Sequence, residues 1–130
     1  MKASVSLPLL SADNVDAGYG HVRVLERVSV NVSQGHVVVL VVRNGAGKST
    51  LLRTLSGLNR PTSGKITFDG RDITGARPNI IVGAGLLHVA EGRRLFRRQS
   101  VTDNIELGRY GVRLNKIGRA SCRERVCHNV

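Results

Sequence analysis

The chain has 130 residues, of which 41% are hydrophobic and 22% charged, as expected for one globular domain rather than a disordered chain. It contains two Phe, two Tyr and no Trp, which predicts an aliphatic core and argues against a protein that stacks single-stranded bases on aromatic rings. The formal net charge of +11 is compatible with a phosphate ligand, an anionic membrane or a nucleic acid.

No apolar run approaches the roughly 20 residues that a membrane span needs. The first residues, Met1 to Pro8, are too few and too polar for a signal peptide. We therefore expect a chain that is made and kept in the cytoplasm.

The first half of the sequence predicts three strands and a helix. The segment 9–16 mixes apolar and polar positions and is a candidate strand, and the valines of 22–32 alternate as in a half-buried strand. The β-branched run 36–42 is typical of a strand that is buried on both faces. After a glycine-bearing loop, the leucines of 48–58 have helical spacing, and Gly57 and Pro61 mark the end of that helix.

The second half predicts shorter elements. A turn at 61–64 precedes a strand at 65–68, and Asp69-Gly70 is typical of a hairpin turn. The apolar run 86–89 is a further candidate strand. A helix is expected to begin near Ser100, capped by the hydroxyl of Ser100 or Thr102, with Asp103 favourable in its first turn.

The chemistry is concentrated in the loop between the buried run and the first helix. Its residues, Asn44-Gly45-Ala46-Gly47-Lys48-Ser49-Thr50, have the composition of a phosphate-binding loop. Two glycines let successive backbone N–H groups curl around phosphate oxygens, and the helix that follows directs its positive end at the anion. Lys48 would supply a charge for the β and γ phosphates, and Ser49 a hydroxyl for Mg²⁺.

One position departs from the general pattern G-x-x-x-x-G-K-[ST]. Val42 stands where its first glycine is expected, and a β-branched residue disfavours positive φ. The alternative interpretation of the segment is an ordinary glycine turn between a strand and a basic helix.

Beyond this loop, the chain resembles the nucleotide-binding subunits of ABC transporters over about 10–115, and within them the branched-chain amino-acid import ATPases of the LivF type. The resemblance implies an α/β fold: a phosphate-loop core of the ABC type, with an antiparallel β region on the N-terminal side. Several short strings in the same order carry it: Ala17-Gly-Tyr-Gly20, Asn44–Thr50, Leu51-Leu-Arg-Thr-Leu-Ser-Gly-Leu58, Pro61-Thr-Ser-Gly64, Phe68-Asp-Gly70, Asp72-Ile-Thr74, Glu91-Gly-Arg-Arg-Leu-Phe96 and Ser100-Val101 with Asn104.

The resemblance also implies roles for residues outside the loop. Tyr19 holds the place of an aromatic that stacks on adenine; the plainer interpretation is a turn tyrosine. Glu91 holds the place of a residue that senses Mg²⁺ and the membrane partner, although Ala90 replaces the usual proline, and the alternative is an exposed acid balanced by neighbouring arginines.

The partners and location follow from the same resemblance. ATP and Mg²⁺ are the implied ligands, and the region 91–98, with Arg93, Arg94, Arg97 and Arg98, would face membrane permease subunits. A second ATP-binding subunit would complete the site, and the protein would lie on the inner face of the cell membrane. We expect no nucleic-acid partner, because no groove-entering element or stacking aromatic is visible.

Three motifs that the family uses for hydrolysis are not found in the sequence. There is no Leu-Ser-Gly-Gly-Gln-like signature, no apolar strand that ends in Asp-Glu, and no suitable switch histidine, since His88 precedes Glu91 and His128 lies near the C-terminus. We therefore expect an N-terminal part of an ATPase that binds nucleotide at best. The competing hypotheses are a soluble ABC-type ATPase without a permease, another phosphate-loop enzyme such as a small kinase, and a basic interaction module without catalysis.

The segment 116–130 differs from the rest of the chain in its cysteine content and in its lack of an apolar pattern. It holds both cysteines, Cys122 and Cys127, and has no apolar period. It resembles the translation of a sequencing-adapter read-through, so we assign 1–115 to the ABC ATP-binding domain and regard 116–130 as a non-native tail. The alternative is a genuine basic tail.

Overall fold

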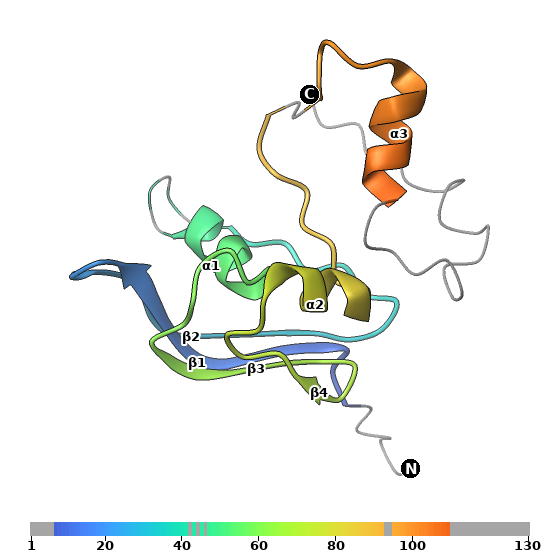
Figure 1. The fold of residues 1–130 in the computed structure, drawn as a ribbon. Helices are drawn as coiled ribbons and strands as arrows, with labels where there is room; N and C mark the ends of the chain where they lie inside the picture. Colours follow the sequence, from blue (N-terminus) through green and yellow to red (C-terminus); the bar gives the residue numbers. More distant parts are fainter. Residues whose placement is uncertain (1–6, 42, 44, 46, 93–94, 110–130) are drawn as a thin grey trace. The chain divides into compact units, whose positions relative to one another are not determined.

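The computed structural model describes residues 7–41, 43, 45, 47–92 and 95–109. They fall into two compact units that divide after residue 94. The first unit contains an antiparallel sheet with two helices over one of its faces (Figure 1). Its elements are β1 (Leu10–Tyr19), β2 (Val22–Val32), α1 (Lys48–Leu55), β3 (Ser63–Phe68), β4 (Arg71–Asp72) and α2 (Pro78–Ala84).

The sheet has the order β2-β1-β3-β4, and every pairing in it is antiparallel. This confirms the antiparallel β region and the strands predicted near 9–16, at 22–32 and at 65–68. The two-residue turn between β3 and β4 is also confirmed: Asp69 and Gly70 both have positive φ, at 48° and 72°, as a type I′ turn requires.

Two bulges shift the phase of the pairing between β1 and β2. Asn14 and Arg27 have φ values of 48° and 43°, and the pairing register shifts near both residues. The shifts bring the odd-numbered Leu25 into the core, whereas Val28, Val30 and Val32 pack at its edge from even positions. A simple period of two therefore describes β2 only in part.

The side chain of Asp16 ties three strands together at the second bulge. Its Oδ1 accepts a hydrogen bond from the backbone N–H of Arg27 at 2.7 Å, and its Oδ2 accepts one from the Ser63 hydroxyl at 2.5 Å. The Ser63 hydroxyl, followed by the Arg27 N–H, lowers the pKa of this carboxyl from its ordinary value. The ionised carboxylate thus holds the start of β3 and the bulge of β2 on β1.

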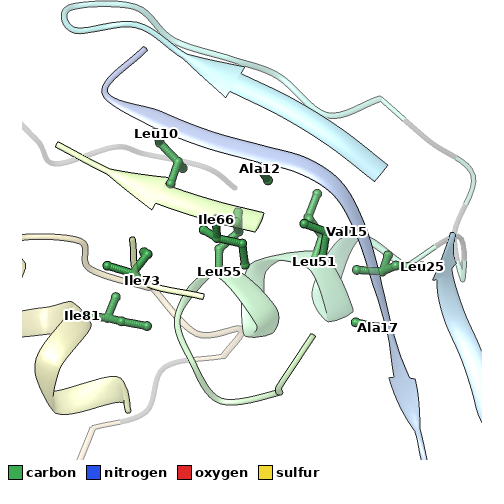
Figure 2. Close-up of a cluster of buried hydrophobic side chains, with 10 residues drawn as sticks. All are labelled: Leu10, Ala12, Val15, Ala17, Leu25, Leu51, Leu55, Ile66, Ile73 and Ile81. Atoms are coloured by element: carbon green, nitrogen blue, oxygen red, sulfur yellow. The ribbon is translucent and has the colours of Figure 1, made fainter. Parts of the chain in front are cut away.

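The core lies between the sheet and the two helices (Figure 2). It is aliphatic, as the composition predicts. Its buried members are Leu10, Ala12, Val15, Ala17, Leu25, Leu51, Leu55, Ile66, Ile73 and Ile81.

Helix α1 ends earlier than its leucine spacing predicts. Gly57 has a φ of 76°, and the N–H groups of Gly57 and Leu58 bond to the carbonyls of Thr54 and Arg53, which closes a Schellman motif. The glycine is required, since a Cβ at position 57 would lie 2.5 Å from the carbonyl oxygen of Ala76. Helix α2 was not predicted from the sequence; it begins at Pro78, and Gly85 ends it with a φ of 106°.

Two segments predicted as strands are not strands in the structure. Residues 36–41 and 86–89 form no ladder, and Val37, Val41 and Val89 are 90%, 86% and 91% exposed. A strand that is buried on both faces belongs to a sheet with a layer packed on each face, and neither segment pairs with a strand of the sheet in the described part of the chain. The described residues therefore contain the antiparallel region without a parallel core sheet.

The second unit contains α3 (Val101–Arg109). The predicted cap is confirmed at Ser100, whose Oγ accepts from the N–H of Asp103 at 3.1 Å, while the Asp103 carboxylate accepts from the N–H of Ser100 at 3.2 Å. The Asn104 side chain bonds to both backbone groups of Phe96, which fixes the turn before the helix. Among the helices that the structure describes, none has the length and apolarity to cross a bilayer.

Gly64 of β3 and Gly70 of the β3–β4 turn allow a matched test of how closely β3 packs on β1. Gly64 and Gly70 both have positive φ, but a Cβ at position 64 would lie 2.4 Å from the carbonyl oxygen of Asn14, whereas position 70 is open. We expect Gly64→Ala to lower the free energy of unfolding by more than about 3 kcal/mol and Gly70→Ala by about 1–2 kcal/mol, measured by urea denaturation. Equal losses would show that the contact between β3 and the Asn14 bulge is loose.

Candidate nucleotide-binding site

The glycine loop leads directly into α1. Gly45 and Gly47 have φ values of 85° and 93°, and the carbonyl of Gly47 accepts the N–H of Leu51 at 2.8 Å to begin the helix. Among the described residues of this helix start, there is no side-chain cap and no acidic side chain in the first turn. The positive end of the helix is therefore available to an external anion.

The position of the helix is set by its buried face. Leu51 and Leu55 pack in the core against the sheet (Figure 2). Thr50 and Thr54 of the same helix are also buried. Lys48 and Ser49 begin the same helix; Lys48 is half-buried and Ser49 is exposed, so burial of the leucines fixes where both polar groups lie. A Cβ at Gly47 would lie 2.8 Å from the Leu25 side chain, which shows how closely the loop approaches β2.

A pocket of about 320 Å³ lies over this helix start. Gly45 and residues 47–50 line one side, and Val24 of β2 and Glu91 complete the described lining. The Ser49 hydroxyl donates a hydrogen bond to Oε1 of Glu91 at 3.1 Å, across 42 residues of sequence. The structure thus brings together the predicted phosphate-loop residues and the predicted Mg²⁺-sensing acid.

The oxygen atoms of Ser49 and Glu91 suit a Mg²⁺ ion. Mg²⁺ prefers hard oxygen ligands and takes most of its coordination from water and substrate phosphates, so two protein oxygens are enough. The described residues contain no cluster of three or more His, Cys, Asp or Glu side chains that could hold a metal without a substrate. The site therefore fits an ion that arrives with a phosphate ligand.

Tyr19 lies at the end of β1 and is 46% exposed, but it is not one of the residues that line the pocket. Hydrogen bonds with Arg53 and then Thr50, both on α1, lower the pKa of its phenol, and the charge of Arg53 acts in the same direction. A side-chain amide of Asn59 also bonds to the carbonyl of Gly18 at 3.3 Å. The hairpin tip is thereby attached to α1 and to the segment that follows it, contacts that the sequence did not reveal.

Several predicted site residues cannot be placed. Val42, Asn44, Ala46, Arg93 and Arg94 lie outside the described residues, as does the segment 116–130. Arg97 and Arg98 are exposed in the second unit.

The fold, with a glycine loop that runs into a lysine-started helix beside an antiparallel sheet, defines a phosphate-loop protein of the ATP-binding-cassette type. A family model described as ABC transporter matches residues 25–130, and the chain belongs to this family.

Comparison with known proteins supports the assignment. The chain is 42% identical over 100 residues to the high-affinity branched-chain amino acid transport ATP-binding protein BraG of Pseudomonas aeruginosa, covering 77% of this chain and 43% of BraG. It is 37% identical over 102 residues to the ribose import ATP-binding protein RbsA 2 of Streptomyces avermitilis, covering 78% of this chain and 20% of that protein. A solved ATP-binding subunit of an ABC transporter superposes with a TM-score of 0.72 at 28% identity, covering 83% of this chain and 44% of that one. The chain thus spans less than half the length of these relatives.

The contact between Tyr19 and Arg53 predicts a measurable titration. In a Tyr110→Phe background, Tyr19 is the single tyrosine of the chain, and its phenolate can be followed by ultraviolet absorbance. Arg53 favours the charged phenolate, so Arg53→Met should raise the pKa of Tyr19. Arg60→Met, a matched change beyond α1, should leave the titration curve where it is; the same curve for all three proteins would mean that Arg53 and Tyr19 do not interact in solution.

Proposed function

We propose that the chain is the nucleotide-binding part of an ABC importer subunit that binds ATP with Mg²⁺. The observation that carries the proposal is the Ser49–Glu91 hydrogen bond at the start of α1, because it joins the predicted phosphate loop and the predicted Mg²⁺-sensing acid in one pocket. The positive end of α1 and the Lys48 ammonium provide the charge for a triphosphate in this pocket.

The polar groups of the glycine loop, the helix start and Glu91 have defined roles in this proposal. The backbone N–H groups of Gly45 and Gly47 and the side chain of Lys48 hold phosphate oxygens, and Ser49 and Glu91 hold Mg²⁺. When bound, Mg²⁺ neutralises phosphate charge. We also propose that the ring of Tyr19 stacks on the adenine. In the complex its phenol either keeps its contacts with Arg53 and Thr50 on α1 or exchanges them for contacts with the nucleotide.

The proposal extends to the intact protein. The second ATP-binding subunit, the permease contact through 91–98, a peripheral location on the inner face of the membrane and the absence of a nucleic-acid partner all belong to it. The identity to BraG favours branched-chain amino acids as the transported substrates, whereas the identity to RbsA 2 favours a sugar as the second candidate. We retain the proposal that the domain comprises 1–115 and that 116–130 is not native to it.

Binding of ATP is the first test. We expect the chain to bind ATP, and Lys48→Ala to weaken binding at least tenfold, because a charge-assisted contact to phosphate is lost. The measurement is the Kd for a fluorescent ATP analogue, with Lys65→Ala as the control, since Lys65 is exposed on β3 and pairs with Asp72 at 4.0 Å. Equal affinities of the wild-type chain and Lys48→Ala would refute the proposed site, and equal losses in both variants would indicate general anion binding by a basic surface.

Hydrolysis is a separate expectation. The sequence contains no signature motif, no Asp-Glu strand end and no switch histidine, and groups of this kind orient the nucleophile and stabilise charge in phosphoryl transfer. We therefore expect phosphate release by the purified chain to stay at the background rate, equal to that of Lys48→Ala. Steady turnover that Lys48→Ala abolishes would contradict this expectation while leaving the nucleotide site intact.

A further inference from the structure

Glu91 is carried by an extended segment that no strand of the described sheet supports. After α2, the N–H of Leu86 bonds to the carbonyl of Ile81 at 3.2 Å, and the Leu86 side chain packs at the edge of the core. From Leu86 to Val89 the exposure alternates, with Leu86 and His88 half-buried and Leu87 and Val89 exposed. His88 therefore occupies the inward-facing position closest in sequence to Glu91.

His88 contacts the far end of α1. Its Nδ1 lies 3.2 Å from Oγ of Ser56, the residue that caps the helix C-terminus and is only 8% exposed. The Ser56 hydroxyl also lies 3.1 Å from the carbonyl oxygen of Arg53. A hydroxyl has one proton and can accept as well as donate, so Ser56 can donate to the Arg53 carbonyl and accept from Nδ1–H of His88 at the same time.

The two contacts of this segment with α1 are separated by nearly the same distance along the segment as along the helix. Ser49 and Ser56 are seven residues apart, which corresponds to about 10.5 Å along a helix. His88 and Glu91 are three residues apart, which corresponds to about 10 Å of extended chain. His88 meets Ser56 while Glu91 meets Ser49, so the segment runs back along α1 and is held at both ends.

We propose that His88 is a positioning residue, which through its hydrogen bond with Ser56 holds the Glu91 carboxylate beside the Ser49 hydroxyl. The proposal rests on the proposed function in so far as these two oxygens hold Mg²⁺. It assigns His88 to the alignment of the site, without contact to nucleotide or metal.

The first experiment examines the chain without nucleotide. A glutamate-specific protease cleaves after Glu91 and, as an internal reference, after the exposed Glu26. We expect His88→Ala and Ser56→Ala to speed cleavage at Glu91 relative to Glu26 about three- to tenfold, the range that loss of one hydrogen bond gives. His88→Asn should restore the wild-type ratio, because its side-chain amide can replace Nδ1. His36→Ala should match wild type, since that exposed ring lies 3.1 Å from the carbonyl oxygen of Gln34 in its own turn. An unchanged ratio in His88→Ala would overturn the proposal.

The second experiment measures the Kd for ATP with Mg²⁺ and with EDTA. We expect His88→Ala and Ser56→Ala to reduce the gain in affinity that Mg²⁺ gives, about three- to tenfold, with little change in EDTA. His88→Asn should retain the gain, and the double variant should lose no more than either single variant. Equal loss with and without Mg²⁺ would show a general structural role and would overturn the positioning role.

The two experiments separate this proposal from the proposed function. If the wild-type chain binds no ATP, or binds it without regard to Lys48, the proposed function fails and the proteolysis ratio alone decides the role of His88. If ATP binding depends on Lys48 and neither readout responds to His88, only the positioning role fails.

Discussion

The packing of α1 on the sheet is the constraint on which the site depends. Leu51 and Leu55 are almost fully buried against a sheet face that includes Val15 and Ile66, and each side chain of this size contributes about 1.5–3 kcal/mol when it leaves water. Because the helix is short, fixing two leucines fixes its axis and rotation. The glycine loop, the lysine and the serine at its N-terminus then have little freedom in direction, and the Schellman motif at Gly57 sets where the opposite end meets His88.

The sequence predicted correctly those elements that depend on a few neighbouring residues. The strand at 22–32, the Asp69-Gly70 turn and the cap at Ser100 are each indicated by a few neighbouring residues, and the structure confirms all three. Glycine followed by Lys-Ser-Thr after an apolar run likewise predicted the helix start and, of the residues that line the pocket, Gly45 and those at 47–50. The bulges at Asn14 and Arg27 were missed, because positive φ at a residue other than glycine is imposed by the surrounding sheet and not by that residue's own preference.

The wrong and the missed predictions concern elements and contacts that depend on residues far away in the sequence. The β-branched residues of 36–41 favour a strand, but a strand exists only where another strand pairs with it, and the sheet of the described residues offers no such pairing. Helix α2 has only seven residues, too few for a clear period, although Pro78 and Gly85 mark its ends. The contacts Tyr19–Arg53 and His88–Ser56 join residues 34 and 32 positions apart, and no local pattern in one sequence predicts such pairs.

The exposed run 37–41 has a consequence for how the chain behaves in concentrated solution. Five consecutive valine and leucine residues with no charge among them have the make-up of segments that stack into intermolecular β-structure. His36 precedes the run and Arg43 follows it after Val42, and the overall charge of +11 makes copies of the chain repel one another. This repulsion is electrostatic and weakens as the Debye length shortens, so added salt, which steadies many proteins, should drive this chain toward aggregates.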